Sequence, residues 1–185
     1  MKKRECILLS LMILLLLGGC AAGREKAQFD AWREQVASAG EISFTAEITG
    51  TWPDGAVTYG AQVCCAGEET SLTITWPETI AGMKVHMNGR GRSLEYDGLL
   101  LSLTGMRENA LSPCDAPALL LSALREGRVL TTGEAGEYRL VTLEAPGGET
   151  VTLWRTAEDI PVSAEIGRNG AAELTLRLEN WQTKE

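Results

Sequence analysis

The sequence contains a single histidine and none of the common catalytic signatures. It has no Gly-x-Ser-x-Gly elbow, and the His-Glu-x-x-His, phosphate-loop and EF-hand patterns are also missing. His86 alternates with Val85 and Met87, which places it on the polar side of a predicted strand as a surface residue. The many carboxylates alternate with threonine at outward strand positions, a pattern typical of a hydrated acidic face. These absences predict a protein that is not an enzyme and that uses neither a metal ion nor a cofactor.

Clusters of basic residues are missing as well. The chain has 17 Lys and Arg against 25 Asp and Glu, and its formal net charge is −8. The basic side chains are scattered, and Arg90 and Arg92 come nearest to forming a cluster. Nucleic acids and anionic lipid headgroups are both bound by concentrated positive charge. We therefore expect no nucleic-acid partner, and we expect membrane attachment to depend on another feature.

No apolar run is long enough to span a bilayer. The longest covers residues 7–17, about half of the ~20 residues that a transmembrane helix needs. It follows Lys2, Lys3 and Arg4 and leads into Leu17-Gly18-Gly19-Cys20, which resembles the lipobox of bacterial lipoproteins. This order predicts a lipoprotein signal peptide over residues 1–19. A general secretory cleavage site beside a chance cysteine is the alternative.

The lipobox resemblance implies that Cys20 is the lipid attachment site and carries fatty acyl chains such as palmitate. Each buried CH₂ of an acyl chain contributes about 0.8 kcal/mol, so two or three chains anchor a protein stably. The mature protein would then be held at the extracytoplasmic face of the cell membrane. We expect a lipidated tether over residues 20–25 and a single domain over residues 26–185.

The cysteine count does not suit a disulfide framework. Five are present, but Cys6 leaves with the signal peptide and Cys20 is acylated, so Cys64, Cys65 and Cys114 remain. No Cys-x-x-Cys or Cys/His spacing for zinc occurs. Cys114 lies at a predicted helix start, where a thiolate is favoured, yet no histidine accompanies it. We expect buried structural thiols, and a bridge from Cys64 or Cys65 to Cys114 stays open.

Hydrophobic periodicity predicts two helices and eleven strands. Phe29, Trp32 and Val36 recur at helical spacing, which indicates a helix over residues 25–38 with Gly40 at its end. From residue 42 onward the period changes to two, as in an antiparallel sheet with one wet face. Pro53-Asp54-Gly55, Asp97-Gly98, Pro146-Gly147-Gly148 and Asn169-Gly170 are predicted turns. The strands are expected near residues 42–52, 57–65, 71–76, 83–88, 92–97, 99–104, 128–132, 136–145, 149–155, 161–168 and 171–182.

The second helix separates the two groups of strands. It is expected to open at Ser112-Pro113-Cys114-Asp115, with serine as N-cap, and to end at Gly127. Leucine and alanine side chains between residues 119 and 124 cover most of its circumference. A helix that is apolar on so many sides is enclosed by other elements. The fold class expected is mainly β (α+β), with a curved antiparallel sheet that forms an incomplete β-barrel around this apolar helix.

This order of elements resembles the lipoprotein-localisation-factor superfamily, called LolA/LolB-like. Its Gram-positive lipoprotein members, including the clostridial spore-germination lipoproteins, are the most similar. The stretches that carry the resemblance are residues 43–47, 77–82 and 94–98, and the Ser112-Pro113 start with the leucine-rich run that follows. The resemblance covers essentially the whole mature chain and implies a non-catalytic half-barrel.

Two functions fit these observations. The resemblance implies that the concave face could bind an acyl chain or a lipoprotein, as a carrier or receptor does. Its candidate ligand-binding residues are Phe44, Trp52, Trp76, Leu120 and Leu124. Trp52 and Trp76 each end a predicted strand and continue its apolar face, either closing the core or lining the mouth of a groove. Alternatively, the second helix fills the concave face, and the protein is a platform that binds or stabilises an extracytoplasmic partner protein. We favour the platform because the helix is apolar enough to occupy the groove.

Overall fold

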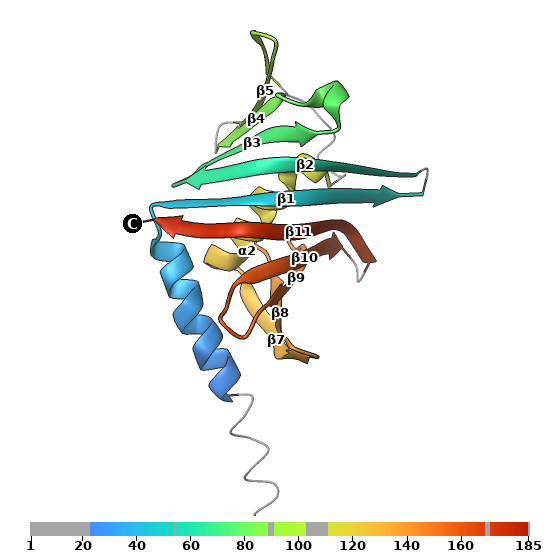
Figure 1. The fold of residues 1–185 in the computed structure, drawn as a ribbon. Helices are drawn as coiled ribbons and strands as arrows, with labels where there is room; N and C mark the ends of the chain where they lie inside the picture. The colour runs from blue at the N-terminus through green and yellow to red at the C-terminus, as the bar shows by residue number, and fades with distance from the viewer. Residues whose placement is uncertain (1–22, 54, 89–90, 103–110, 169–170, 185) are drawn as a thin grey trace, which may run out of the picture.

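The computed structural model describes residues 23–53, 55–88, 91–102, 111–168 and 171–184 (Figure 1). Within these residues the chain forms one sheet of eleven strands in the spatial order β6-β5-β4-β3-β2-β1-β11-β10-β9-β8-β7. The first half comprises β1 Glu41–Trp52, β2 Gly55–Ala66, β3 Glu69–Trp76, β4 Lys84–Asn88, β5 Gly91–Tyr96 and β6 Leu99–Ser102. The second half comprises β7 Arg128–Ala135, β8 Tyr138–Glu144, β9 Thr150–Arg155, β10 Pro161–Arg168 and β11 Ala171–Lys184. All neighbouring strands are antiparallel, and the halves join where β1 pairs with β11.

The turns explain how such a sheet is built from consecutive hairpins. Asp97 and Gly98 join β5 to β6 with φ angles of 48° and 75°. A two-residue turn with both central φ angles positive matches the twist of its flanking strands, and an Asp-Gly pair tolerates it. The predicted hairpin at this dipeptide is therefore confirmed. Asp54 and the pair Asn169-Gly170 lie outside the described residues.

The core lies between the inner face of the sheet and α2, which spans Ala116–Glu126. This helix packs against β8, β10 and β11, while the preceding 3-10 turn η2, Pro113–Asp115, contacts β1. Leu120 and Leu124 are 0% exposed, and every second residue of β1 from Ile42 to Gly50 is buried. The sheet has β6 and β7 at its two edges. The predicted fold class, an incomplete barrel around an apolar helix, is confirmed.

The start of the second helix differs from the prediction. Ser112 has extended backbone angles and its side chain makes no capping hydrogen bond; the α-helix begins only after η2. Asp115, the acidic residue three positions after Ser112, pairs instead with a distant residue: its Oδ1 lies 3.0 Å from Arg92 Nη1 on β5. A long-range ion pair has replaced the local cap. The predicted end is correct, since the Gly127 N–H donates to the Ala123 carbonyl at 2.9 Å.

The N-terminal helix covers residues 23–38, so it begins two residues before its predicted start at residue 25. Phe29 and Val36 are buried as expected of the apolar stripe. The Gly40 N–H donates to the Lys184 carbonyl at 2.9 Å, so this glycine links the helix to the end of β11. The helix lies at the end of the sheet where β11 terminates (Figure 1). Neither helix in the described residues has the length and hydropathy needed to cross a membrane.

Candidate functional site

The five residues predicted to bind a ligand do not form one site. Leu120 and Leu124 are completely buried between α2 and the sheet. Phe44 is buried on β1 and stacks on Trp181, with ring centroids 5.0 Å apart and an interplanar angle of 16°. These three side chains occupy the concave face as core residues.

Trp52 stays on the inner face but closes one end of the core. Gly50, two residues earlier on the same face, is buried. A Cβ atom there would lie 2.6 Å from both the Trp52 ring and Pro113 of η2. Gly50 therefore leaves space in which the indole of Trp52 and the pyrrolidine of Pro113 meet. Of the two roles considered for Trp52, this geometry corresponds to closing the core.

Trp76 does not continue the inner face of β3, so that prediction was wrong. Ala61 pairs with Ile74, but Gly60 pairs with Trp76, so β3 carries one extra residue, Thr75, at this point. An extra residue in one strand reverses the side-chain alternation beyond it. Trp76 is consequently 41% exposed on the outer face, the face directed away from α2. Its indole lies over Gly60, where any Cβ atom would collide with the Trp76 ring.

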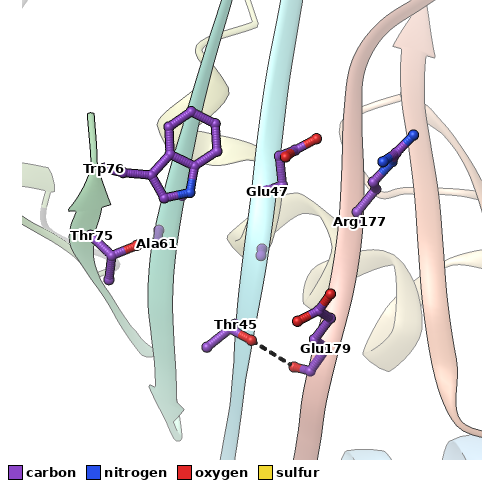
Figure 2. Close-up of a pocket in the computed structure, with 9 residues that line it drawn as sticks. Thr45, Glu47, Ala61, Thr75, Trp76, Arg177 and Glu179 are labelled. Atoms are coloured by element: carbon purple, nitrogen blue, oxygen red, sulfur yellow. Dashed lines mark hydrogen bonds between the residues drawn. The ribbon is translucent and has the colours of Figure 1, made fainter. Parts of the chain in front are cut away.

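The outer face next to Trp76 forms a groove of about 240 Å³ (Figure 2). Glu47 projects from β1, and Arg177 and Glu179 project from β11. The Thr45 hydroxyl donates to the Glu179 carbonyl at 3.2 Å and links the two strands at the floor of the groove. One aromatic wall therefore faces a set of exposed charged side chains. Periodicity alone could not predict this groove, because a bulge puts Trp76 there.

A buried polar cluster lies at the start of α2. The Tyr59 hydroxyl donates to Cys114 Sγ at 3.5 Å, and Asp115 pairs with Arg92. Burial raises the pKa of Tyr59, and Cys114 adds to this effect. Burial also raises the pKa of the Asp115 carboxyl, although the Arg92 charge and the Ser112 backbone act in the opposite direction. The cluster ties the start of α2 to β2 and β5.

The three cysteines of the domain are free thiols in the structure. Cys65 is buried on the inner face of β2, and its neighbour Cys64 lines a groove on the outer face. Burial raises the pKa of Cys65 to about 11, which disfavours the reactive thiolate. His86 is exposed, with Nε2 3.6 Å from Glu95, as predicted for a surface histidine. Among the described residues, no three His, Cys, Asp or Glu side chains gather closely enough to hold a metal ion.

Arg33, which periodicity did not single out, fastens the N-terminal helix to α2. Its guanidinium donates hydrogen bonds to the carbonyls of Leu124, Arg125 and Gly127 at 2.6, 3.1 and 2.7 Å. These groups belong to the last turn of α2 and its C-cap, where carbonyls lack intrahelical partners and a cation is favoured. The two helices are thus joined by a long-range cap.

A second arginine, Arg155, holds the other side of the N-terminal helix. Its guanidinium lies 4.9 Å from the ring centroid of Phe29 and 4.8 Å from that of Trp32. The Arg155 side chain is buried and pairs with Asp159, which also pairs with Arg139 at 3.0 Å. Cation–π contacts strengthen when the cation is removed from water. The N-terminal helix is therefore attached to the domain by both charge and stacking.

The edge strand β6 exposes apolar side chains. Leu99, Leu100 and Leu101 are 67%, 68% and 55% exposed. Leu99 pairs with Tyr96 and Leu101 with Leu94, so both leucines extend the inner face of β5 beyond the core. β6 is an edge strand, so one of its two sides has no neighbouring strand among the described residues. A run of exposed leucine on a sheet edge is a typical contact surface for another molecule.

No family model matches this sequence, and no curated protein matches it either. Solved structures with a similar fold include a LolA superfamily protein from Nitrosomonas europaea, at 14% identity and a TM-score of 0.44, covering 84% of this chain and 93% of that one. A putative outer membrane lipoprotein-sorting protein domain from Vibrio parahaemolyticus matches at 11% identity and a TM-score of 0.45, covering 84% and 91%. A structure of the CwlD amidase from Clostridioides difficile in complex with the GerS lipoprotein matches at 12% identity and a TM-score of 0.40, covering 85% and 94%. Each of these likenesses concerns the fold alone.

Proposed function

We propose that this protein is a lipid-anchored, non-catalytic platform on the extracytoplasmic face of the membrane, where it binds or stabilises an envelope partner protein. The observation that carries the proposal is the filled concave face. Leu120, Leu121 and Leu124 are at most 2% exposed, and α2 occupies the space that an acyl chain would need. Protein interiors are close-packed, so a ligand could enter only if this helix moved out.

The attachment of α2 argues against such a movement. Arg33 donates three hydrogen bonds to its last turn, and Arg92 pairs with Asp115 just before its first turn. Each hydrogen bond from the Arg33 guanidinium contributes about 1.5–3 kcal/mol, whereas the contact between Arg92 and Asp115 is an ion pair. Both ends of α2 are therefore in contact with charged groups of other elements. A mobile lid over a ligand site would, by contrast, be one of the least stable parts of the structure.

The exposed leucines of β6 supply the surface for the partner. The proposed acylation site, Cys20, is three residues before the helix that begins at residue 23, a distance of roughly 10 Å when extended. In Figure 1 the N-terminal helix and β5, the neighbour of β6, lie at opposite ends of the molecule. The leucines would then face away from the membrane. An apolar strand or surface of a protein partner fits this edge better than lipid does.

Site-specific photo-crosslinking in the native envelope tests the platform. A photoreactive residue at position 100, on the β6 edge, should yield one discrete protein adduct. The matched control is position 130, a 40%-exposed leucine on β7 at the other edge of the same sheet. An adduct from position 100 and none from position 130 is the expected result. Equal labelling at the two edges, or none at position 100, would contradict a partner on β6.

Native mass spectrometry tests the alternative, in which the concave face carries an acyl chain or a lipoprotein. Protein extracted gently from membranes should show the mass of the acylated chain without a further non-covalent lipid. Replacement of Leu120 by the larger phenylalanine serves as a control, because it would displace any species held beside α2. A stoichiometric lipid that this substitution removes would overturn the platform in favour of a carrier.

A further inference from the structure

The outer face of the sheet carries a row of registered residues with a tryptophan at each end. Each member is paired with the next on the neighbouring strand, across six strands from β3 to β9. In spatial order the row is Trp76, Gly60, Glu47, Arg177, Ser163 and Trp154. Five strand spacings of about 4.8 Å give a row roughly 24 Å long, measured along the sheet. At the β1–β11 junction the two neighbours in the row, Glu47 and Arg177, are more than 100 residues apart in the sequence.

All of these residues face away from the core. Their neighbours along each strand, such as Ile48, Leu176 and Leu153, are buried on the inner face. Side chains alternate between the faces of a strand, and registered partners share one face. From Gly60 on β2 to Trp154 on β9, the backbone of the row is used in ladders on both sides, so only side chains are available to a ligand there. Strand addition is therefore excluded at these five strands.

Each tryptophan borders a groove on the outer face, where Trp76 is 41% exposed and Trp154 is half-buried. Trp76 lies flat over Gly60 and borders the groove shown in Figure 2. Trp154 borders a second groove of about 470 Å³, together with Tyr138 and Val162. Arg177 and Glu179 line both grooves, so the two grooves adjoin along the row. A long ligand could contact both indoles at once.

The middle of the row offers hydrogen-bonding groups of both kinds. Glu47 accepts hydrogen bonds and Arg177 donates them, and both side chains are exposed. Although they are registered partners, they form no ion pair with each other or with another residue that the structure describes. Ser163 donates to the Leu176 carbonyl at 3.0 Å and keeps its oxygen as an acceptor. These groups suit a ligand whose hydroxyls both donate and accept.

We propose that this row is a binding surface for an extended, neutral polysaccharide strand. The flat apolar faces of sugar rings stack on the exposed indole of Trp76 and on the accessible part of the half-buried indole of Trp154, and their hydroxyls bond to the carboxylates and the guanidinium between them. Glu179 and Glu165 lie beside the row and make the surface acidic, which disfavours polyanionic chains. The proposal goes beyond the platform function and concerns a surface other than β6, so the two can fail independently.

An oligosaccharide array and calorimetry on the intact mature protein test this surface. The probes are neutral β-linked chains of glucose and of N-acetylglucosamine, short and long, with a sulfated chain as the anionic comparison. The wild type should bind long neutral chains more tightly than short ones, because only long chains reach both indoles. Trp76→Ala and Trp154→Ala should each lower the affinity at least about tenfold.

Two further variants keep the test independent of folding. Arg177→Ala changes an exposed side chain that lines both grooves and should also weaken binding by about tenfold. Leu130→Ala on β7 is the control and should bind like the wild type. Thermal unfolding of every variant identifies any loss due to misfolding. Absence of binding to every neutral chain, preference for the sulfated chain, or binding that Trp76→Ala, Trp154→Ala and Arg177→Ala all retain would overturn the proposal.

Discussion

Truncation of Leu124 to alanine tests whether α2 is part of the core. Leu124 is 0% exposed and lies in the last turn of α2, whose carbonyls Arg33 caps through its guanidinium. Leu→Ala substitutions at such positions lose the transfer free energy of the removed carbons and leave a cavity, at about 2–5 kcal/mol in all. We expect a loss of about 3 kcal/mol in the free energy of unfolding, because α2 is held at both ends and cannot readily collapse into the space.

Equilibrium unfolding in urea measures this loss. With a slope of about 2–3 kcal/mol per molar urea, a loss of about 3 kcal/mol moves the midpoint by roughly 1–1.5 M. Leu100→Ala is the matched control, because it removes the same atoms from a side chain that is 68% exposed on β6. Its effect should stay within about 0.5 kcal/mol. If Leu124→Ala also changed stability by less than 1 kcal/mol, α2 would be a loosely held lid and the reasoning for a filled concave face would be refuted.

Three other predictions concern the anchor, the thiols and the buried acid. A metabolic fatty-acid probe should label the wild-type protein but not Cys20→Ala; equal labelling of both would exclude a lipoprotein anchored there. Mature protein purified under oxidising conditions and then denatured should release three titratable thiols, whereas a single thiol would show that a disulfide forms. The raised pKa of Asp115 means that its folded form binds a proton more readily than its unfolded form, so lowering the pH through the folded pKa should stabilise the wild type relative to Asp115→Asn. A stability difference between these two proteins that is independent of pH, or that changes in the opposite direction, would contradict the burial of this carboxyl.

Local patterns in the sequence determined the elements and the faces they bury. A period of two with β-branched residues placed Phe44, Ala46 and Ile48 on one face of β1, and all three are buried. The Asp97-Gly98 dipeptide predicted its hairpin because few residues adopt the positive φ angles of that turn. The apolar run of α2 predicted an enclosed helix, because such a surface is stable only when surrounded. Each of these inferences depends on interactions between residues close together in the chain.

The tertiary structure decided which of these residues meet. The bulge at Thr75 turned Trp76 outward, and alternation along a single strand contains no sign of a bulge that depends on the pairing with β2. Arg92 met Asp115, and Arg33 met the last turn of α2, across long stretches of chain. The outer row exists only because β1 pairs with β11 in one register, which brings Glu47 beside Arg177. Register between distant strands is set by how the whole sheet packs around α2, and no local periodicity encodes it.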